Sequence, residues 1–391
     1  MPGLKQKSLA GVYIHIPFCR QACHYCNFHF STSLRLRKEM TEALVKEIGI
    51  TAGRQDQTAK NIETLYFGGG TPSLLNNVEL EQVFEALHKH FVFADDIEVT
   101  LEANPDDISA KRLYEWRSLG INRFSVGIQS FLDKELQWMN RAHNSSEALQ
   151  SIDLIREAGF TNFSADLIYG SPLLSDEDWK KNADLLFEKG IPHISCYALT
   201  VEPKTALDKM IALKKKEAVD PEKQARQFTL LMDWMNKAGY EHYEISNFAR
   251  PGMRSKHNSS YWQGIPYFGF GPSAHSFDGK SRKWNIANNA LYIQSIQKGI
   301  LPFEEELLTS TQMINEYIMT ALRTIEGLDL DLVKERFGES PKDDLVAGSL
   351  KWQKGGKLLM KDSKLVLTRE GKLYADGIAS DLFMTAVLTD K

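Results

Sequence analysis

The first half of the sequence alternates short apolar strands with amphipathic helices, and this repeat constrains the fold more than any other feature. Strands are predicted at residues 12–16, 62–67, 97–101, 123–128, 163–168 and 193–199. Helical periodicity lies between them at 34–50, 77–91, 109–119, 132–140, 145–158 and 176–188. Such repeats form a parallel sheet covered by helices. Because their crossovers are right-handed, six units curl into a complete or incomplete α/β barrel.

Each predicted strand ends in residues that are polar, rich in glycine or able to bind a metal. In chain order these are a cysteine loop, the glycine-rich turn 68–71, Glu102 with Asn104, Gln129, Asp166, and Tyr197 with Ala198. In α/β barrels, the residues that carry chemistry lie at the carboxyl ends of the strands. The sequence therefore predicts one functional site along this edge of the sheet.

Three of the four cysteines lie within eight residues, as Cys19, Cys23 and Cys26. A thiolate-rich site of this kind selects zinc, copper(I) or an iron–sulfur cluster. A structural zinc site needs four ligands, so here His24 or His29 would have to complete it. On a cubic [4Fe-4S] cluster, three cysteines leave one iron open to a small molecule.

The segment 13–19, Tyr-Ile-His-Ile-Pro-Phe-Cys, followed by the two further cysteines, resembles the radical S-adenosylmethionine (SAM) family. The flanking residues are similar to the branch that contains oxygen-independent coproporphyrinogen III oxidases and haem chaperones. The resemblance covers nearly the whole chain from residue 11. It implies a partial (β/α)6 barrel and a [4Fe-4S] cluster on Cys19, Cys23 and Cys26. It also implies that the open iron binds the amino and carboxylate groups of SAM.

The same resemblance implies further cofactor-binding residues, most of them at the strand ends. Those expected beside SAM are Tyr13, Tyr25, Gly69, Gly70, Thr71 and Glu102. Those matching a second SAM site in the oxidase are Gln129, Arg141, Asp166 and Ala198. Simpler roles stay open for several of them. Tyr25 could shield the cluster from water instead of stacking on adenine, and the glycines could simply form a tight turn. Arg141 and Asp166 could form a salt bridge with each other.

The segment 257–262, His-Asn-Ser-Ser-Tyr-Trp, matches the H-N-x-x-Y-W motif of the haem-chaperone branch. Imidazole is a common axial ligand of haem iron, so His257 is the candidate haem ligand; the alternative is a hydrogen-bonded structural role. His275 matches a SAM-side position of the oxidase or is structural. Phe28 stands where the oxidase has a further cysteine, and the chain has no long extension before its first strand. Both departures favour the chaperone branch.

Three regions are expected along the chain: a barrel over residues 1–245, a segment of loops and short strands closing the barrel mouth over 246–300, and a C-terminal domain over 301–391. Helices at 311–323, 330–337 and 342–351 and strands at 357–360 and 365–368 predict a winged-helix-like α+β fold for the last region. Its acidic residues outnumber its basic residues. Nucleic-acid surfaces carry the opposite charge, so we expect a lid or docking module.

Composition limits the compartment and the partners. The net charge is −4, from 47 Lys and Arg against 51 Asp and Glu, which argues against nucleic acid as a partner. No apolar run reaches the roughly 18 residues of a membrane span, and residues 1–10 lack an apolar signal core. We expect a cytoplasmic protein that is at most peripheral to the membrane.

The leading hypothesis is a chaperone that binds haem, a [4Fe-4S] cluster and SAM and delivers haem to apo-haemoproteins, at the cytoplasmic face of the membrane. The alternative is an enzyme of porphyrin biosynthesis, oxygen-independent coproporphyrinogen III dehydrogenase. In that enzyme a radical derived from SAM removes hydrogen from propionate side chains. A radical SAM enzyme that modifies nucleic acid is a third hypothesis, which the acidic C-terminal region disfavours.

Overall fold

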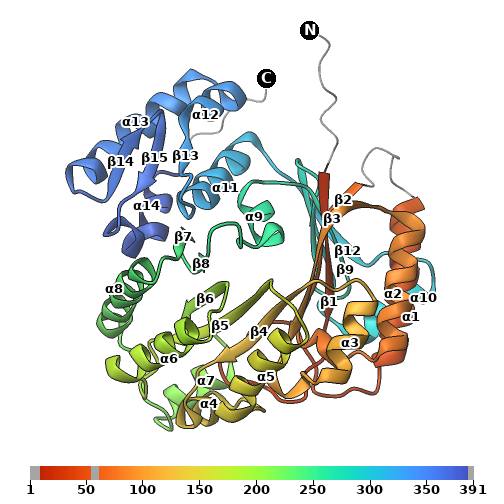
Figure 1. Ribbon diagram of the computed structural model, residues 1–391. Coiled ribbons are helices and arrows are strands. Elements are labelled where there is room, and N and C mark those ends of the chain that lie inside the picture. Colours follow the sequence, from red (N-terminus) through yellow and green to blue (C-terminus); the bar gives the residue numbers. More distant parts are fainter. Residues whose placement is uncertain (1–8, 54–60, 386–391) are drawn as a thin grey trace.

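Six parallel strands form the centre of a single large sheet (Figure 1). The computed structural model describes residues 9–53 and 61–385; residues 1–8, most of the polar N-terminal segment noted above, lie outside this range. The strands are β1 (Leu9–Ile16), β2 (Asn61–Gly69), β3 (Val92–Ala103), β4 (Arg123–Gln129), β5 (Phe163–Tyr169) and β6 (His193–Ala198). They pair in chain order. The predicted α/β fold with a partial six-unit barrel is confirmed.

Helices cover the convex face of this sheet (Figure 1). They are α1 (Arg37–Gly53), α2 (Asn77–His90), α3 (Ala110–Ser118), α5 (Ser145–Glu157), α6 (Asp176–Glu188) and α8 (Pro221–Lys237). The short helices α4 (Asp133–Met139) and α7 (Ala206–Ala212) lie instead at the cysteine loop, where the backbone of His24 bonds to both. Strand alternation sorts the side chains between the two faces. In β1, Val12, Ile14 and Ile16 are fully buried in the core beneath the helices, whereas Tyr13 and His15 point to the concave side.

The strands that follow the barrel extend both edges of the sheet. On the β1 edge lie β9 (Tyr267–Phe270), β10 (His275–Phe277), β11 (Ser281–Asn285) and β12 (Phe303–Leu307), and on the β6 edge lie β8 (Asn247–Ala249) and β7 (Glu241–Glu244). The segment 246–300 contains short strands, as expected from the sequence, and its closing of the barrel mouth stays a prediction. Its strands widen the sheet, which ends at β12 and β7, and it also contains helices α9 (Lys256–Trp262) and α10 (Asn289–Gln297).

The C-terminal region has a hydrophobic core of its own, built around Ile314, Ile318, Leu345 and Ile378. Its helices are α11 (Ser310–Leu322), α12 (Leu330–Phe337), α13 (Glu339–Lys354) and α14 (Ala375–Asp381). Its small antiparallel sheet has the order β13 (Leu328–Asp329), β15 (Lys364–Leu367), β14 (Leu358–Lys361). The predicted winged-helix-like α+β fold is confirmed, with one strand more than the sequence suggested.

Candidate functional site

The three clustered cysteines lie in the loop directly after β1, and all of them are free thiols that are partly exposed. Thr71 donates a hydrogen bond from its hydroxyl to the Cys19 sulfur at 3.5 Å, and Arg141 donates one to the Cys23 sulfur at 3.3 Å. The pKa of Cys19 is raised to about 11, mainly by burial and to a smaller extent by the negative charges of Cys26 and Cys23. Three thiolates can therefore be held here together only when a cation offsets their charge, which is what a metal cluster supplies.

A zinc site would need either His24 or His29 as its fourth ligand, and each of them already uses one ring nitrogen elsewhere. His24 Nδ1 lies 3.0 Å from the carbonyl oxygen of Trp138 and 2.9 Å from Lys216 Nζ. His29 Nε2 lies 2.7 Å from Asn289 Oδ1. Within the described residues, no group of three Cys, His, Asp or Glu side chains is arranged around one ion position. These contacts favour a cluster, in which each sulfur binds a different iron, over a single tetrahedral zinc ion.

Glu102 ends β3 and faces the cysteine loop across the concave side of the sheet. Its carboxylate accepts hydrogen bonds from the Tyr66 hydroxyl at 2.7 Å and from the Gly69 backbone N–H at 3.1 Å. Burial raises the pKa of Glu102 to about 7; the hydrogen bond from Tyr66 opposes this rise, and the charge of Asp166 adds to it. A carboxylate so placed can receive a hydroxyl or an ammonium group.

The glycines of the turn after β2 are explained by packing within the protein. Gly69 has φ +109°, and a Cβ atom there would lie 2.6 Å from the imidazole of His15. A Cβ atom on Gly70 would lie 2.7 Å from the carbonyl oxygen of Phe18. Side chains are thus excluded so that the turn can pass close to β1 and the cysteine loop. This is the tight-turn alternative, which does not conflict with a ligand above the turn.

Arg141 connects three strand ends. Its guanidinium donates to Asn104 Oδ1 at 2.6 Å and to the Gly127 carbonyl at 2.9 Å, besides the Cys23 sulfur. Asp166 instead accepts a hydrogen bond from the Ser125 hydroxyl at 3.0 Å. The salt bridge between Arg141 and Asp166 that the sequence left open is therefore wrong, because each side chain has other partners.

The remaining strand-end residues also reach this side of the sheet. Gln129 has φ +65°, a conformation that is uncommon for residues other than glycine and that re-aims the chain after β4. Tyr25 packs against a small cluster that includes Leu136 and Met139. Ala198 ends β6 and pairs with Tyr169 of β5.

His257 lies on α9 and is 2% exposed. Its Nδ1 is 2.8 Å from Thr64 Oγ1 and its Nε2 is 2.8 Å from the Tyr261 hydroxyl, while its ring stacks on Tyr66 at 4.9 Å. Burial lowers the pKa of His257 to about 3, so the ring is neutral, with one donor and one acceptor nitrogen. Both nitrogens are used, which corresponds to the hydrogen-bonded structural alternative.

Two residues of this face were missed from the sequence. Tyr66 links Glu102 to His257 through a hydrogen bond and a ring stack. Arg123 is fully buried, and its Nε lies 3.8 Å from Glu98 Oε2. Tyr66 could have been found, because it is a polar residue inside an apolar strand at the alternate position that faces the site. Arg123 begins its strand, where a surface position is the usual expectation.

Comparison with known proteins gives concordant results. Residues 13–186 match the radical SAM superfamily, and residues 308–374 match the HemN C-terminal domain. The chain is 33% identical over 377 residues to heme chaperone HemW of Mycobacterium tuberculosis, covering 95% of this chain and 94% of the relative. It is also 33% identical over 374 residues to heme chaperone HemW of Bacillus subtilis, and that match covers 95% of this chain and 98% of the relative. The chain belongs to the HemW family of the radical SAM superfamily. This confirms the resemblance inferred from the cysteine loop.

A solved structure supports the fold of this HemW-family chain. Coproporphyrinogen III oxidase (HemN) from Escherichia coli, described as a radical SAM enzyme, superposes with a TM-score of 0.82 over 97% of this chain and 91% of its own. The two sequences are 23% identical, so this likeness concerns the fold alone.

Membership of the radical SAM superfamily implies a [4Fe-4S] cluster and SAM. The donor set fits, because three free thiols share one loop and the charges of Cys23 and Cys26 act on Cys19. When bound, the cluster supplies one-electron chemistry to SAM. Within residues 9–53 and 61–385, none of the helices combines the length and apolar character needed to cross a membrane.

Glu102 should make the stability of the protein depend on pH. Its folded-state pKa of about 7 exceeds the ordinary 4.5, so its contribution is fully present below pH 4.5 and is lost as the pH rises to about 7. Urea unfolding of the cluster-free protein at several pH values in this window measures the slope. The Glu102→Gln variant has no titrating group at this position, so the free energy of unfolding of that variant should fall less steeply over the same pH window. Equal slopes for the two proteins would contradict the assignment.

Proposed function

We propose that this protein is a haem chaperone that binds haem, a [4Fe-4S] cluster and SAM and delivers haem to apo-haemoproteins in the cytoplasm, at the inner face of the membrane. The observation that carries the proposal is the shared name of relatives that are about one third identical over nearly the whole chain. The His-Asn-Ser-Ser-Tyr-Trp segment typical of the chaperone branch supports it.

The cluster and SAM have proposed residues at the strand ends, and the proposed haem ligand is His257 on α9. Cys19, Cys23 and Cys26 would hold the cluster. SAM would lie between the cluster and the concave face, against Tyr13, Tyr25, Gly69, Gly70, Thr71 and Glu102. Glu102 would receive an ammonium or hydroxyl group, in keeping with its place beside the Gly69 N–H. Gln129, Arg141 and Asp166 would contact a second SAM, as in the oxidase, although Arg141 also reaches the Cys23 sulfur.

The second candidate is oxygen-independent coproporphyrinogen III dehydrogenase, which the fold shared with the oxidase permits. Phe28 speaks against it, because the oxidase has a cysteine at this position; Phe28 is 67% exposed. The assay that decides is protoporphyrinogen formation from coproporphyrinogen III under strict anaerobiosis with reductant and SAM. Sustained turnover would replace the chaperone proposal.

The chaperone proposal predicts saturable haem binding and haem transfer. Titration of the anaerobically reconstituted protein with haemin should shift the Soret band to a saturating limit near one haem per chain. Mixing the loaded protein with the apo-form of a b-type cytochrome should then convert the spectrum to that of the holo-cytochrome faster than spontaneous haem release into buffer. Transfer no faster than this release would contradict delivery, and the absence of a saturable shift would contradict haem binding.

A further inference from the structure

Glu102 is the carboxylate proposed to receive SAM, and two groups of β2 hold it in place. Tyr66 donates its hydroxyl to Oε1 at 2.7 Å, and Gly69 donates its backbone N–H to Oε2 at 3.1 Å. The Gly69 bond comes from the backbone, so it cannot shift unless the strand moves. The direction in which the carboxylate points therefore depends mainly on where the Tyr66 side chain is held.

The side chain of Tyr66 is held by neighbouring rings. It stacks on the imidazole of His257, with 4.9 Å between the ring centroids and 24° between the planes. The ring of Tyr13 on β1 also stacks with it, at 6.1 Å. Tyr66 is 8% exposed, and a ring in a closely packed interior can move only if its neighbours move as well. The position of the Tyr66 hydroxyl thus depends on His257.

His257 is itself fixed through both ring nitrogens. Thr64 Oγ1 lies 2.8 Å from Nδ1, and the Tyr261 hydroxyl, one turn farther along α9, lies 2.8 Å from Nε2. Thr64 and Tyr66 are alternate residues of β2, so they face the same side of the sheet. The same strand therefore contacts the imidazole twice and holds Glu102 twice. Together these contacts join helix α9 to the SAM side of the barrel.

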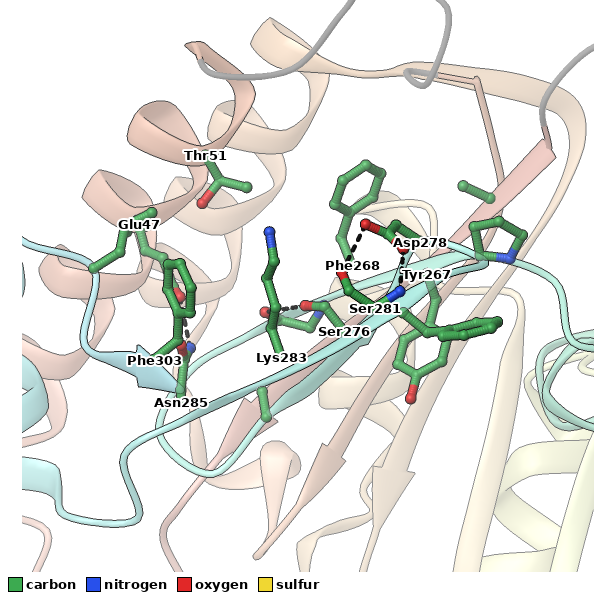
Figure 2. Close-up of a pocket in the computed structure, with 16 residues that line it drawn as sticks. Glu47, Thr51, Tyr267, Phe268, Ser276, Asp278, Ser281, Lys283, Asn285 and Phe303 are labelled. Carbon is green, nitrogen blue, oxygen red and sulfur yellow. Dashed lines mark hydrogen bonds between the residues drawn. The ribbon is translucent and has the colours of Figure 1, made fainter. Parts of the chain in front are cut away.

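The row of side chains continues from α9 to β9 on the concave side of the sheet. Tyr261 meets the ring of Tyr267 edge-on, at 4.7 Å. Figure 2 shows that the Tyr267 ring projects from β9 on the side opposite to Lys283. The cavity of about 340 Å³ in that figure, whose lining includes Glu47 and Lys283, opens on the helix side. The contacts from Tyr267 to Glu102 therefore form one row that this cavity does not interrupt.

We propose that Tyr66 is a positioning residue for SAM binding and that His257 supports it, so that helix α9 with its H-N-x-x-Y-W segment tunes the affinity of the barrel for SAM. The inference rests on the proposed function, because it takes Glu102 as the residue that receives SAM. Neither Tyr66 nor His257 needs to touch SAM. A binding side chain is effective only when its neighbours hold it in the productive geometry. This role is additional to the proposed haem ligation by His257.

The test is SAM binding to the anaerobically reconstituted full chain, measured by equilibrium dialysis. Tyr66→Phe keeps the ring stack and removes only the hydroxyl that donates to Glu102. The affinity for SAM should fall about tenfold, the effect of losing one hydrogen bond to a charged group. Thr64→Val removes the hydroxyl that fixes His257 and leaves the contacts of Glu102 in place. It should weaken SAM binding by a smaller factor.

The double variant and a matched control show whether the effects share one route. If Thr64 acts through His257 and Tyr66, Thr64→Val should have little further effect in a chain that already carries Tyr66→Phe. The control is Tyr243→Phe, because the Tyr243 hydroxyl lies 2.7 Å from His193 Nε2 in a second buried tyrosine–histidine pair outside this row. Tyr243→Phe should bind SAM like the unmodified protein.

The pH profile of SAM binding separates positioning from a general loss of structure. Burial raises the pKa of Glu102 to about 7, and the hydrogen bond from Tyr66 opposes this rise. An ionised carboxylate is the better acceptor, so affinity should increase as the pH rises through this pKa. In Tyr66→Phe the pKa is higher, so the midpoint should move to higher pH, whereas a structural loss would lower affinity equally at every pH. The other titratable groups facing Glu102 are the same in both proteins: Cys26 of the cysteine loop, Tyr13 of β1, Asp166 of β5, Tyr197 of β6 and Tyr261 of α9.

The outcomes separate this inference from the proposed function. If the unmodified protein does not bind SAM, the SAM part of the proposed function fails together with the inference. If it binds SAM and Tyr66→Phe keeps the same affinity and the same pH midpoint, the inference fails and the proposed function stands. An unchanged affinity in Thr64→Val would overturn the role of α9, and an equal loss in Tyr243→Phe would assign the effect to packing in general. Circular dichroism verifies that each variant is folded.

Discussion

Replacing any one of Cys19, Cys23 and Cys26 by serine should leave the anaerobically reconstituted protein without its [4Fe-4S] cluster. The three thiolates share one loop, and the remaining cysteine, Cys196, is buried in β6, so nothing nearby can replace a lost sulfur. Serine is a harder and far less acidic ligand than cysteine and holds iron poorly in such a site. Iron and sulfide should fall from about four of each per chain toward zero, as measured by elemental analysis.

Cys196→Ser is the matched control for this loss. It removes a thiol of the same chain that lies away from the loop, and its iron and sulfide content should equal that of the unmodified protein. Circular dichroism of the three loop variants should match that of the unmodified protein, because the loop cysteines are partly exposed and take little part in the core; Cys196 is a core residue, so the spectrum of Cys196→Ser verifies that this control is folded. Full iron and sulfide content in Cys23→Ser would contradict the three-cysteine site. Stoichiometric zinc in the unmodified protein, without iron and sulfide, would favour the Cys3His alternative.

The parts of the fold that follow local rules could be predicted from the sequence. Helix α6 begins and ends where the sequence placed it, because Ser175 caps its first turn by accepting a hydrogen bond from the Asp178 N–H and Gly190 follows its end with a positive φ. The position of the site could also be predicted. Parallel strands end at the same edge of a sheet, and strand alternation shows which side chains face the site there.

Other features could not be predicted from the local sequence, because they depend on residues that are distant in the chain. Helix α9 has a local cap in Ser255, but its first N–H groups, those of Lys256 and His257, donate hydrogen bonds to the carboxylate of Glu98, more than 150 residues earlier. The role of His257 depends equally on Thr64 of β2. Neither partner has a signal in the local sequence. The motif predicts a haem ligand at His257, which stays a prediction, and the contacts of His257 add a role in holding α9 against β2.

Glu98 should be among the residues on which folding depends most. Its carboxylate is 5% exposed, faces the fully buried Arg123 at 3.8 Å, and accepts hydrogen bonds from the backbone N–H groups of Lys256 at 3.1 Å and His257 at 3.0 Å. Glu98→Ala would leave a buried guanidinium without a counter-charge and the start of α9 without its acceptor. Removing one partner of a buried ion pair costs about 3–5 kcal/mol, so the free energy of unfolding in urea should fall by this amount.

Asp96→Ala is the control, because Asp96 lies two residues earlier on β3 and also binds Lys256, through its side chain at 2.6 Å. Its carboxylate is 80% exposed, so solvent screens the ion pair and the loss there should be much smaller than for Glu98→Ala. The loss of stability for Glu98→Gln should lie between the losses for Glu98→Ala and Asp96→Ala. The amide keeps an acceptor oxygen for α9 but lacks the charge that Arg123 needs. A loss for Glu98→Ala no greater than for Asp96→Ala would mean that water or another group satisfies Arg123. The position of His257 beside Tyr66 would then not depend on this carboxylate.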